Sequence, residues 1–559
     1  MGTGGAGGNI TTYGWDARSN PTSAKLPTGA TSAFGAYATI AGVDLPPSFT
    51  DAQGNKTSYT YDTAGNTKTV SVTGDGNLRS RTDATGTTTY QPDALNRETV
   101  RTLPDHSTTV LSYDPAGNVQ TYTDPTGQVV YGYDAANNLH TLKDPSGATT
   151  TYTYNNDNIL TTTAYPGGTT QTIGLDNSNR PTSITVKAGS TTLVDLGYTY
   201  TTGPSSTDGT LVHTRKDNQT STTTTYAYDA QNRLSTAKES ANANWVYCYD
   251  PAGNITSTSA GSSTTCPGST TYSYNDASEL TSKNGSTTGW SYNTDGDETT
   301  ANSGSGVRTN ETWSDYNQLT SLTAAGTPYT ATYAGTDNGE RTSLTAAGTA
   351  TTFHNGPEGL AASTTNGTDT GFTREPGGTL NSMRTSGKSY YYLTDADGSV
   401  LGLVDNTGTR VDAYTYDPAG NARTLTQNTP QPYRFQGAYL DPTGLYKMGA
   451  RYYDPTLTRF TQTDPSDQET NPYTAFGNNP ANNTDPNGTF SLSGILGVGS
   501  DVFGAVTGCL SGIGAASETG VTEAASVLGG PVGGAAAIIG SCAAGGFMGY
   551  EGADIISYG

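Results

Sequence analysis

Tyrosine alternates with small polar residues in short segments along most of the chain. Two tyrosines spaced two residues apart precede a polar turn at Tyr59 and Tyr61, Tyr131 and Tyr133, Tyr152 and Tyr154, Tyr226 and Tyr228, and Tyr247 and Tyr249. Residues i and i+2 of a β-strand project from the same face, so the tyrosines share one side and the intervening residues face the other. The pattern therefore predicts short strands with a tyrosine-bearing face.

A turn motif follows these strands at a regular interval. The run Tyr113-Asp-Pro-Ala-Gly-Asn118 recurs in variant form from Tyr61, Tyr133, Tyr228, Tyr249 and Tyr416. Its first polar residue recurs after 20, 21 and 21 residues, at Asp114, Asp134, Asn155 and Asp176. A second motif, Asp124-Pro-Thr-Gly127 or Asp144-Pro-Ser-Gly147, lies 10 residues after the preceding turn. The chain is therefore built from internal repeats.

These motifs have the chemistry of tight turns. Asp at the first position, Pro at the second and Gly at the fourth favour a type I turn. Turns every ten residues leave strands of about six residues, joined as antiparallel hairpins. Successive hairpins form one long sheet, which has to curl or close to protect its edges. The sequence thus predicts an all-β protein.

Composition supports this prediction and excludes one class of function. Only 32% of the residues are hydrophobic, which by itself would permit disorder, but 37 Tyr and 71 Gly favour strands and turns. The net charge is −22. A protein that coats nucleic acid needs a basic surface, so we expect no nucleic-acid partner.

The repeats resemble the tyrosine–aspartate (YD) repeats of bacterial Rhs proteins, of the C component of insecticidal toxin complexes and of teneurins. The resemblance covers about residues 10–488 and implies a long spiralling antiparallel sheet that closes into a hollow shell. We divide the chain into an irregular N-terminal β segment, a YD-repeat shell, a core that plugs the shell, and a Gly/Ala-rich, helical C-terminal tail. Their ranges are 1–56, 57–389, 390–488 and 489–559.

The segment 390–488 resembles an Rhs repeat-associated core domain. The motifs that carry the resemblance are Tyr390-Tyr-Tyr-Leu-Thr-Asp-Ala-Asp-Gly398, Tyr433-Arg-Phe-Gln-Gly437, Asp441-Pro-Thr-Gly444, Gly449-Ala-Arg-Tyr-Tyr-Asp-Pro455, Asp464-Pro465 and Asp485-Pro-Asn-Gly488. The resemblance implies that Asp464 and Asp485, assisted by Arg451, cut the chain close to Thr489. In such a pair one carboxylate activates water while the other donates a proton to the scissile carbonyl.

The chain departs from the family pattern at two positions. The first aspartate motif reads Asp464-Pro-Ser-Asp467, with a carboxylate in place of the usual glycine. Thr489 stands where a large apolar residue is usual. Both departures weaken the expectation of efficient self-cleavage, and the alternative is that Asp464 and Asp485 only cap turns.

The cysteines and histidines indicate no metal and no cofactor. Cys248 and Cys266 lack the spacing and the neighbouring histidines of a zinc site. They form either a disulfide, which would contribute about 3 kcal/mol, or two unpaired thiols. The four histidines are scattered over unrelated repeat positions: His106, His140, His213 and His354.

The composition changes near Phe490. The tail contains no Lys, Arg or His, which disfavours an enzyme that uses them, and residues 524–550 carry no charge. That length suits a membrane span, so we consider a membrane-inserting tail over 502–550 beside an inert or shell-packed one. The N-terminus shows no signal peptide, and we interpret the chain as a piece of a longer protein that is secreted or at the cell surface.

Two functions remain open at this point. In the first, the chain is an Rhs-type shell that encloses and delivers its own C-terminal tail, together with a secretion system or toxin complex and an immunity protein. In the second, it is a non-cleaving, teneurin-like adhesion protein. In that case Trp245, Trp290 and Trp313 could stack on carbohydrate. The core followed by the change in composition favours delivery.

Overall fold

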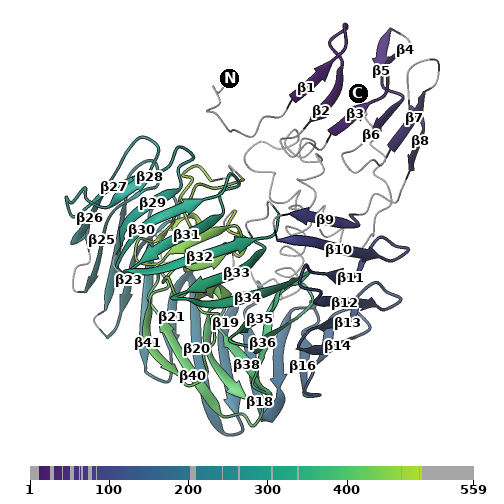
Figure 1. The fold of residues 1–559 in the computed structure, drawn as a ribbon. Coiled ribbons are helices and arrows are strands. Elements are labelled where there is room, and N and C mark those ends of the chain that lie inside the picture. The colour runs from purple at the N-terminus through teal and green to yellow at the C-terminus, as the bar shows by residue number, and fades with distance from the viewer. Residues whose placement is uncertain are drawn as a thin grey trace. The chain divides into compact units, whose positions relative to one another are not determined.

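A computed structural model of the chain describes residues 12–489 and 492–493, with gaps at 26–30, 41, 51–55, 62, 64–66, 74–77, 84, 202–208, 242, 262–264, 304–305, 336–338 and 467–468 (Figure 1). Strands and turns dominate these ranges, which hold three short 3-10 turns but no α-helix: η1 (Pro166–Gly168), η2 (Phe435–Gly437) and η3 (Phe476–Asn478). The predicted all-β class is confirmed. The tail beyond Thr489, expected to be helical, lies outside the described residues except for 492–493.

Within the described ranges, no helix has the length and apolar character needed to cross a membrane. The membrane-inserting segment considered from the sequence, 502–550, falls outside these ranges.

The chain divides into two compact units. The first comprises Met1–Arg81 and Thr89–Thr99, and the second comprises Thr82–Thr88 and Val100–Gly559. In the first unit six strands form an antiparallel sheet in the order β1-β2-β3-β6-β7-β8, and β4 pairs with β5. Their bounds are β1 (Thr12–Trp15), β2 (Pro21–Lys25), β3 (Thr31–Phe34), β4 (Ala38–Ile40), β5 (Val43–Leu45), β6 (Ser48–Thr50), β7 (Lys56–Tyr61) and β8 (Thr67–Thr73). The boundary expected at residue 56 falls inside β7, which pairs with both β6 and β8.

The second unit begins with a long series in which each strand pairs with the next. Strands β9 (Ser80–Asp83), β10 (Gly86–Pro92) and β11 (Glu98–Thr102) contain residues of both units. The series continues through β12 (Thr108–Tyr113), β13 (Val119–Asp124), β14 (Gly127–Tyr133), β15 (Leu139–Lys143), β16 (Thr149–Tyr154), β17 (Leu160–Tyr165), β18 (Thr169–Leu175), β19 (Pro181–Ala188), β20 (Thr191–Thr201), β21 (Leu211–Asp217), β22 (Thr222–Tyr228), β23 (Leu234–Glu239), β24 (Asn244–Tyr249), β25 (Ile255–Gly261), β26 (Thr270–Tyr274) and β27 (Leu280–Lys283).

A second antiparallel series has the same sequential order. It comprises β28 (Trp290–Tyr292), β29 (Glu298–Ser303), β30 (Gly306–Trp313), β31 (Leu319–Ala324), β32 (Thr327–Tyr333), β33 (Arg341–Ala346), β34 (Thr349–Gly356), β35 (Gly359–Thr365), β36 (Thr368–Arg374), β37 (Leu380–Thr385), β38 (Lys388–Thr394), β39 (Val400–Asp405), β40 (Arg410–Tyr416) and β41 (Ala422–Gln427). We call the strands β12–β41 the shell.

The turns of the repeat have the chemistry that the sequence predicts. Gly117 N–H donates to the Asp114 carbonyl at 3.0 Å, and Asn118 N–H donates to the Asp114 carboxylate at 2.9 Å. Gly117 has a φ of 95°, and the register shifts at the adjacent Tyr113. A type I turn closed by a left-handed residue matches the twist of a hairpin, which explains why Gly or Asn recurs at this position.

The two tyrosines of each strand have different roles. The first, such as Tyr131 or Tyr152, is buried in the core. The second donates its hydroxyl hydrogen to a backbone carbonyl of the preceding hairpin, at 2.7 to 3.0 Å in four repeats. These pairs are Tyr133 to Val119, Tyr154 to Leu139, Tyr249 to Leu234, and Tyr333 to Leu319. Phenylalanine could not make this bond because it lacks the donor, whereas Trp313 makes an equivalent one from its indole N–H to the Glu298 carbonyl at 2.7 Å.

The shell curls so that strands far apart in sequence face one another (Figure 1). Tyr152 of β16 donates to Glu375 at 2.7 Å, and Tyr391 of β38 donates to Asp144 at 3.0 Å. A cavity of about 510 Å³ lies between these walls. Its lining includes Asp485 and residues of β17–β19 and β34–β35. The predicted hollow, curled sheet is confirmed.

A small antiparallel sheet follows the shell and packs against it. It consists of β42 (Tyr439–Leu440), β43 (Tyr446–Met448), β44 (Arg451–Asp454) and β45 (Arg459–Phe460). A separate two-stranded sheet pairs β46 (Asn483–Thr484) with β47 (Leu492–Ser493). Tyr446, Tyr453, Phe460 and Phe476 form its aromatic core. We call residues 433–489 the plug.

Cys248 of β24 and Cys266 are joined in a disulfide. The bridge links β24 to the connection between β25 and β26, over a sequence separation of 18 residues.

Candidate functional site

The three residues singled out from the sequence are all buried in the plug. Arg451 opens β44, Asp464 follows β45, and Asp485 follows β46. Their exposed fractions are 0% for Arg451, 2% for Asp464 and 1% for Asp485. Charged groups are rarely buried unless they are paired, so the contacts of each residue decide what the site can do.

Arg451 holds Asp485 and the segment after it in place. Its Nη2 lies 3.2 Å from Asp485 Oδ2, Nη1 donates to the Pro472 carbonyl at 3.0 Å, and Nε donates to the Gly488 carbonyl. The guanidinium lies 3.6 Å from the centre of the Phe460 ring, which adds a cation–π contact. Arg451 thus fixes both the carboxylate and the backbone leading to Thr489.

The surroundings of Asp485 bring its titration into the neutral range. Burial raises the pKa of its carboxyl to about 7, while Arg451 and the N–H of Thr489 pull this pKa downward. The negative charges of Glu469 and Asp464 act with burial to raise it. A carboxyl with a pKa near the working pH suits general acid–base chemistry.

Asp464 lies in a turn that the backbone and one serine complete. Its Oδ1 accepts from the Ser466 N–H at 2.9 Å and from the Ser466 hydroxyl at 2.8 Å. Its Oδ2 accepts from the N–H of Glu469 at 3.1 Å. Asp467, the departure from the family pattern, is outside the described residues.

The two aspartates converge on Thr489. Asp485 Oδ1 accepts from the Thr489 N–H at 3.1 Å. Ser466 Oγ, which contacts Asp464, also lies 2.9 Å from the Thr489 carbonyl oxygen. The backbone on either side of the Thr489 Cα is therefore held by one aspartate directly and by the other through a serine.

Close backbone packing positions this segment. Gly488 has a φ of 63°, and a Cβ atom there would lie 2.2 Å from the Met448 carbonyl oxygen. The Asn487 carbonyl accepts from the Ala450 N–H at 2.8 Å. Glycine at the end of Asp485-Pro-Asn-Gly488 is therefore needed for the chain to pass beside β43 and β44.

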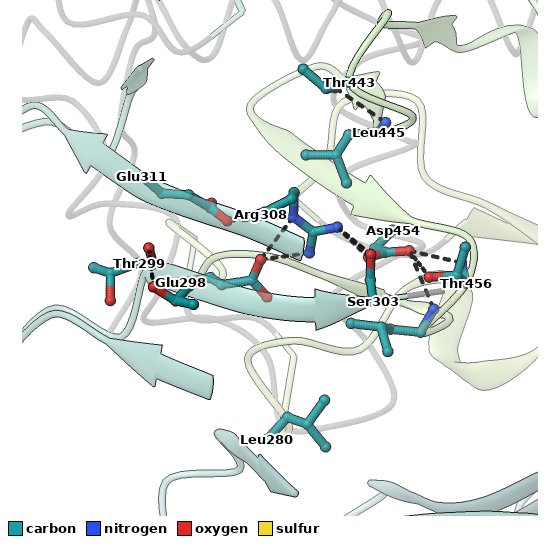
Figure 2. Close-up of polar contacts among 12 residues, drawn as sticks. Leu280, Glu298, Thr299, Ser303, Arg308, Glu311, Thr443, Leu445, Asp454 and Thr456 are labelled. Carbon is teal, nitrogen blue, oxygen red and sulfur yellow. Dashed lines mark hydrogen bonds and ion pairs between the residues drawn. The ribbon is translucent and has the colours of Figure 1, made fainter. Parts of the chain in front are cut away.

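A second buried charge cluster joins the plug to the shell, and the sequence analysis did not identify it (Figure 2). Figure 2 shows Arg308 of β30 between Glu298 of β29 and Asp454 of β44. The guanidinium lies 2.5 Å from Glu298 and 2.6 Å from Asp454. Glu311 lies 3.4 Å from its Nε. Asp454 stands in a conspicuous Arg-Tyr-Tyr-Asp-Pro run, but no signal in the sequence pairs it with Arg308.

Sequence reasoning also missed Ser466 and Phe460 as parts of the aspartate site. Ser466 occupies a position that varies in the motif, and only the fold brings it to Thr489. The tryptophans considered as carbohydrate platforms are partly buried. Trp245 and Trp290 pack against one shell cluster and Trp313 against another.

Family comparisons agree with this architecture. The family described as Teneurin YD-shell matches residues 363–483, and the family described as RHS Repeat matches residues 73–109, 113–143 and 133–170. The matched segments carry the YD-repeat pattern of these two families.

Curated proteins with similar YD-repeat segments include toxins and a surface protein. The tRNA3(Ser)-specific nuclease WapA of Bacillus spizizenii is 31% identical over 262 residues, 43% of this chain and 11% of the relative. Toxin subunit YenC2 of Yersinia entomophaga is 34% identical over 111 residues, 19% of this chain and 11% of the relative. Salivary gland surface protein 1 of Aedes aegypti is 36% identical over 148 residues, 26% of this chain and 4% of the relative. The chain spans about a tenth or less of the length of these relatives.

Solved structures share the YD-shell fold. The crystal structure of TcdB2-TccC3-Cdc42 aligns with a TM-score of 0.60 and 17% identity, covering 86% of this chain and 30% of that chain. The Photorhabdus luminescens Tc holotoxin pore aligns with a TM-score of 0.58 and 16% identity, covering 86% and 29%.

Proposed function

We propose that the chain is the shell-forming part of a toxin-delivery protein and that it cuts its own backbone between Thr489 and Phe490. The hollow shell and the toxin relatives support the delivery role. The cut would separate the shell from the segment 490–559, which serves as the cargo in this proposal.

One observation carries the cleavage proposal: the aspartate site holds both polar backbone groups of Thr489. Asp485 binds its N–H and the Asp464–Ser466 pair contacts its carbonyl oxygen. A turn-capping aspartate needs only the N–H groups of its own turn. Contact with the carbonyl of a segment 23 residues further along is what a reaction at that carbonyl requires.

The chemistry follows from two carboxyl groups that differ in environment. Asp485, with a pKa of about 7, is partly ionised at neutral pH and acts as the general base that takes a proton from the attacking water. The Ser466 hydroxyl, held beside Asp464, lies at the Thr489 carbonyl oxygen, where a hydrogen-bond donor stabilises the negative charge that develops when water adds. Arg451 favours the ionised form of Asp485 and fixes its orientation. Asp485 then returns its proton to the Phe490 nitrogen as the bond from the Thr489 carbonyl carbon to that nitrogen breaks, which leaves a carboxyl group and an amine.

Expression of the full chain followed by mass spectrometry tests this proposal. The expected product is a fragment spanning 490–559, 70 residues long. Asp464→Asn and Asp485→Asn should each abolish it. Asp114→Asn, which alters an equivalent Asp-Pro turn outside the site, should cleave like the unchanged chain. If the unchanged chain yields only full-length protein, the cleavage proposal is wrong and a non-cleaving, surface-exposed binding shell becomes the better reading.

Retention of the fragment tests the delivery half of the proposal. If the shell keeps its cargo after the cut, both pieces should elute together in size-exclusion chromatography under native conditions and separate in denaturant. Immediate separation under native conditions would contradict enclosure. Export to the cell surface or medium, a toxin-complex or secretion-system partner and an immunity protein are part of the same proposal, supported by the names of the toxin relatives.

A further inference from the structure

The repeat turns of the shell share a backbone carbonyl that the turn itself does not use. The fourth residue of the turn is left-handed, with a φ of 62° at Asn232 and 85° at Gly253. The N–H of this residue closes the turn on the first one, as Asn232 does on Asp229 and Gly253 does on Asp250. Its carbonyl takes no part in that closure. Successive repeats therefore present the same hydrogen-bond acceptor at the same turn position.

Five consecutive turns of this kind give their carbonyl to a side chain of the plug. The donor and acceptor atoms lie 2.6 to 3.0 Å apart. The pairs are Asn479 Nδ2 with Asn232, Asn478 Nδ2 with Gly253, Arg459 Nη2 with Ser278, the Tyr473 hydroxyl with Gly296, and Gln462 Nε2 with Asn317. The plug thus binds one backbone carbonyl per repeat, which requires a donor in the plug but no particular side chain in the shell.

These contacts span the junction of the two strand series. Strand β27 pairs with β26 and β28 pairs with β29, and among the described residues no ladder joins β27 to β28. The Leu280 N–H of β27 donates instead to the Tyr292 hydroxyl of β28 at 3.1 Å. Three of the five turns precede this junction and two follow it. The plug is therefore bonded to both sides of a place where strand pairing is interrupted.

The plug holds the two sides by different kinds of contact. Its buried ion pairs with the second series join Asp454 to Arg308 of β30 and Asp441 to Arg341 of β33. The three turns of the first series are held through hydrogen bonds to neutral carbonyls. Separating the partners of a buried ion pair costs more than separating a hydrogen bond to a neutral group. The first series is therefore the side that separates from the plug more readily.

We propose that the plug clamps the two strand series together at the junction of β27 and β28, and that the shell opens there when the first series separates from the plug. The clamp needs no cut in the backbone, so it goes beyond the proposed function. Its donors are Asn478, Asn479 and Arg459 toward the first series, and Tyr473 and Gln462 toward the second.

Hydrogen exchange of the full chain, followed by mass spectrometry, tests the clamp. The amides of residues 280–292 report on the junction, and those of β14 report on a part of the shell that these five donors do not bind. The double variant Tyr473→Phe with Asn478→Gly removes one donor on each side. Phenylalanine keeps the ring, and glycine tolerates the φ of 58° at residue 478. Exchange at 280–292 should become about 10-fold faster, the scale expected when two buried hydrogen bonds are lost.

Tyr446→Phe is the matched control. The Tyr446 hydroxyl donates to the Gly420 carbonyl at 2.9 Å, which is the same kind of bond to a left-handed turn residue, but between β40 and β41. This substitution should leave exchange at 280–292 unchanged. Tyr473→Phe alone should give a smaller acceleration at 280–292, and it keeps the test valid if the double variant does not fold.

The pattern of exchange decides the outcome. Faster exchange at 280–292 with unchanged exchange in β14 supports the clamp. Unchanged exchange at 280–292 in the folded variants overturns it. An equal acceleration in β14, or the same acceleration in Tyr446→Phe, shows a general loosening of the fold and also overturns it.

Discussion

The Arg308 guanidinium of the shell lies 2.6 Å from the Asp454 carboxylate of the plug, across 146 residues of sequence. Both side chains are buried, with exposed fractions of 2% and 1%. Such a pair stabilises a structure only while both partners are present, because removal of one leaves the other charge buried and uncompensated. This contact is therefore one of those that hold the plug on the shell, together with the buried pair of Arg341 and Asp441.

Arg308→Met should lower the free energy of unfolding by about 3–5 kcal/mol, because it leaves the buried carboxylates of Glu298 and Asp454 without their cationic partner. Urea unfolding measures the change. Arg233→Met is the matched control, since Arg233 pairs with Asp229 at 2.6 Å with exposed fractions of 18% and 23%. Its loss should cost less than that of Arg308, because water reaches both of its charged groups and can solvate the carboxylate left behind. Equal costs for the two substitutions would contradict a special role for Arg308.

Glu311 should make the stability of this cluster depend on pH. Burial and the charge of Glu298 raise the pKa of its carboxyl well above the usual value, whereas Arg308 lowers it. In the unfolded chain this pKa is about 4.3. The folded state therefore keeps a proton that the unfolded state has lost, and the stabilisation falls as pH rises from about 4.3 toward the raised pKa.

Glu311→Gln mimics the protonated form at every pH and isolates this effect. The free energy of unfolding of the parent chain, minus that of the variant, should decrease between pH 5 and pH 9. Asp454 and Glu298, the other carboxylates on Arg308, are present in both proteins and cancel in the difference. A difference that stays constant with pH would show that Glu311 is already ionised.

Arg451 should set the pH at which self-cleavage begins. If Asp485 is the general base, the rate rises as pH passes through about 7, because the ionised form is the active one. Arg451 lowers this pKa, so Arg451→Gln should move the half-maximal pH upward. Arg451→Lys keeps the charge and should move it less. A midpoint that is the same in all three proteins would exclude Asp485 as the titrating base.

Tyr249→Phe should lower the free energy of unfolding by about 1 kcal/mol. The change removes the 2.7 Å hydrogen bond from the phenol to the Leu234 carbonyl but keeps the ring. Tyr392→Phe is the control, because its buried hydroxyl has no hydrogen-bond partner among the residues that the structure describes. That substitution should leave stability unchanged or raise it. Chemical denaturation of both variants checks the contrast.

The sequence was sufficient to predict the local structure of the shell. Turn residues such as Asp114 and Gly117 act on their own neighbours, so a spacing of 10 and 21 residues is enough to place hairpins. The common face of Tyr131 and Tyr133 follows from strand geometry alone. The different roles of these two tyrosines could not be predicted, because the second one bonds to a different hairpin.

Only the residues of the candidate site that belong to family motifs could be predicted from the sequence. Arg451, Asp464 and Asp485 came from motif positions, and the structure places all three in the plug. Ser466 and the Arg308–Asp454 pair depend on how distant segments meet. The contact of Ser466 with Thr489 spans 23 residues and that of Arg308 with Asp454 spans 146, and neither spacing follows a repeat that a single sequence would reveal.

The bonds from the second tyrosine to the hairpin just before it make the steps of the shell that contain them alike. Tyr133 and Tyr154 reach back by 14 and 15 residues, as Tyr249 does by 15. Gain or loss of one whole hairpin would therefore leave the remaining tyrosine bonds intact, whereas an insertion of a few residues would break one of them. Lineages of this protein should accordingly differ in length by whole modules, and a designer could enlarge the container by copying one.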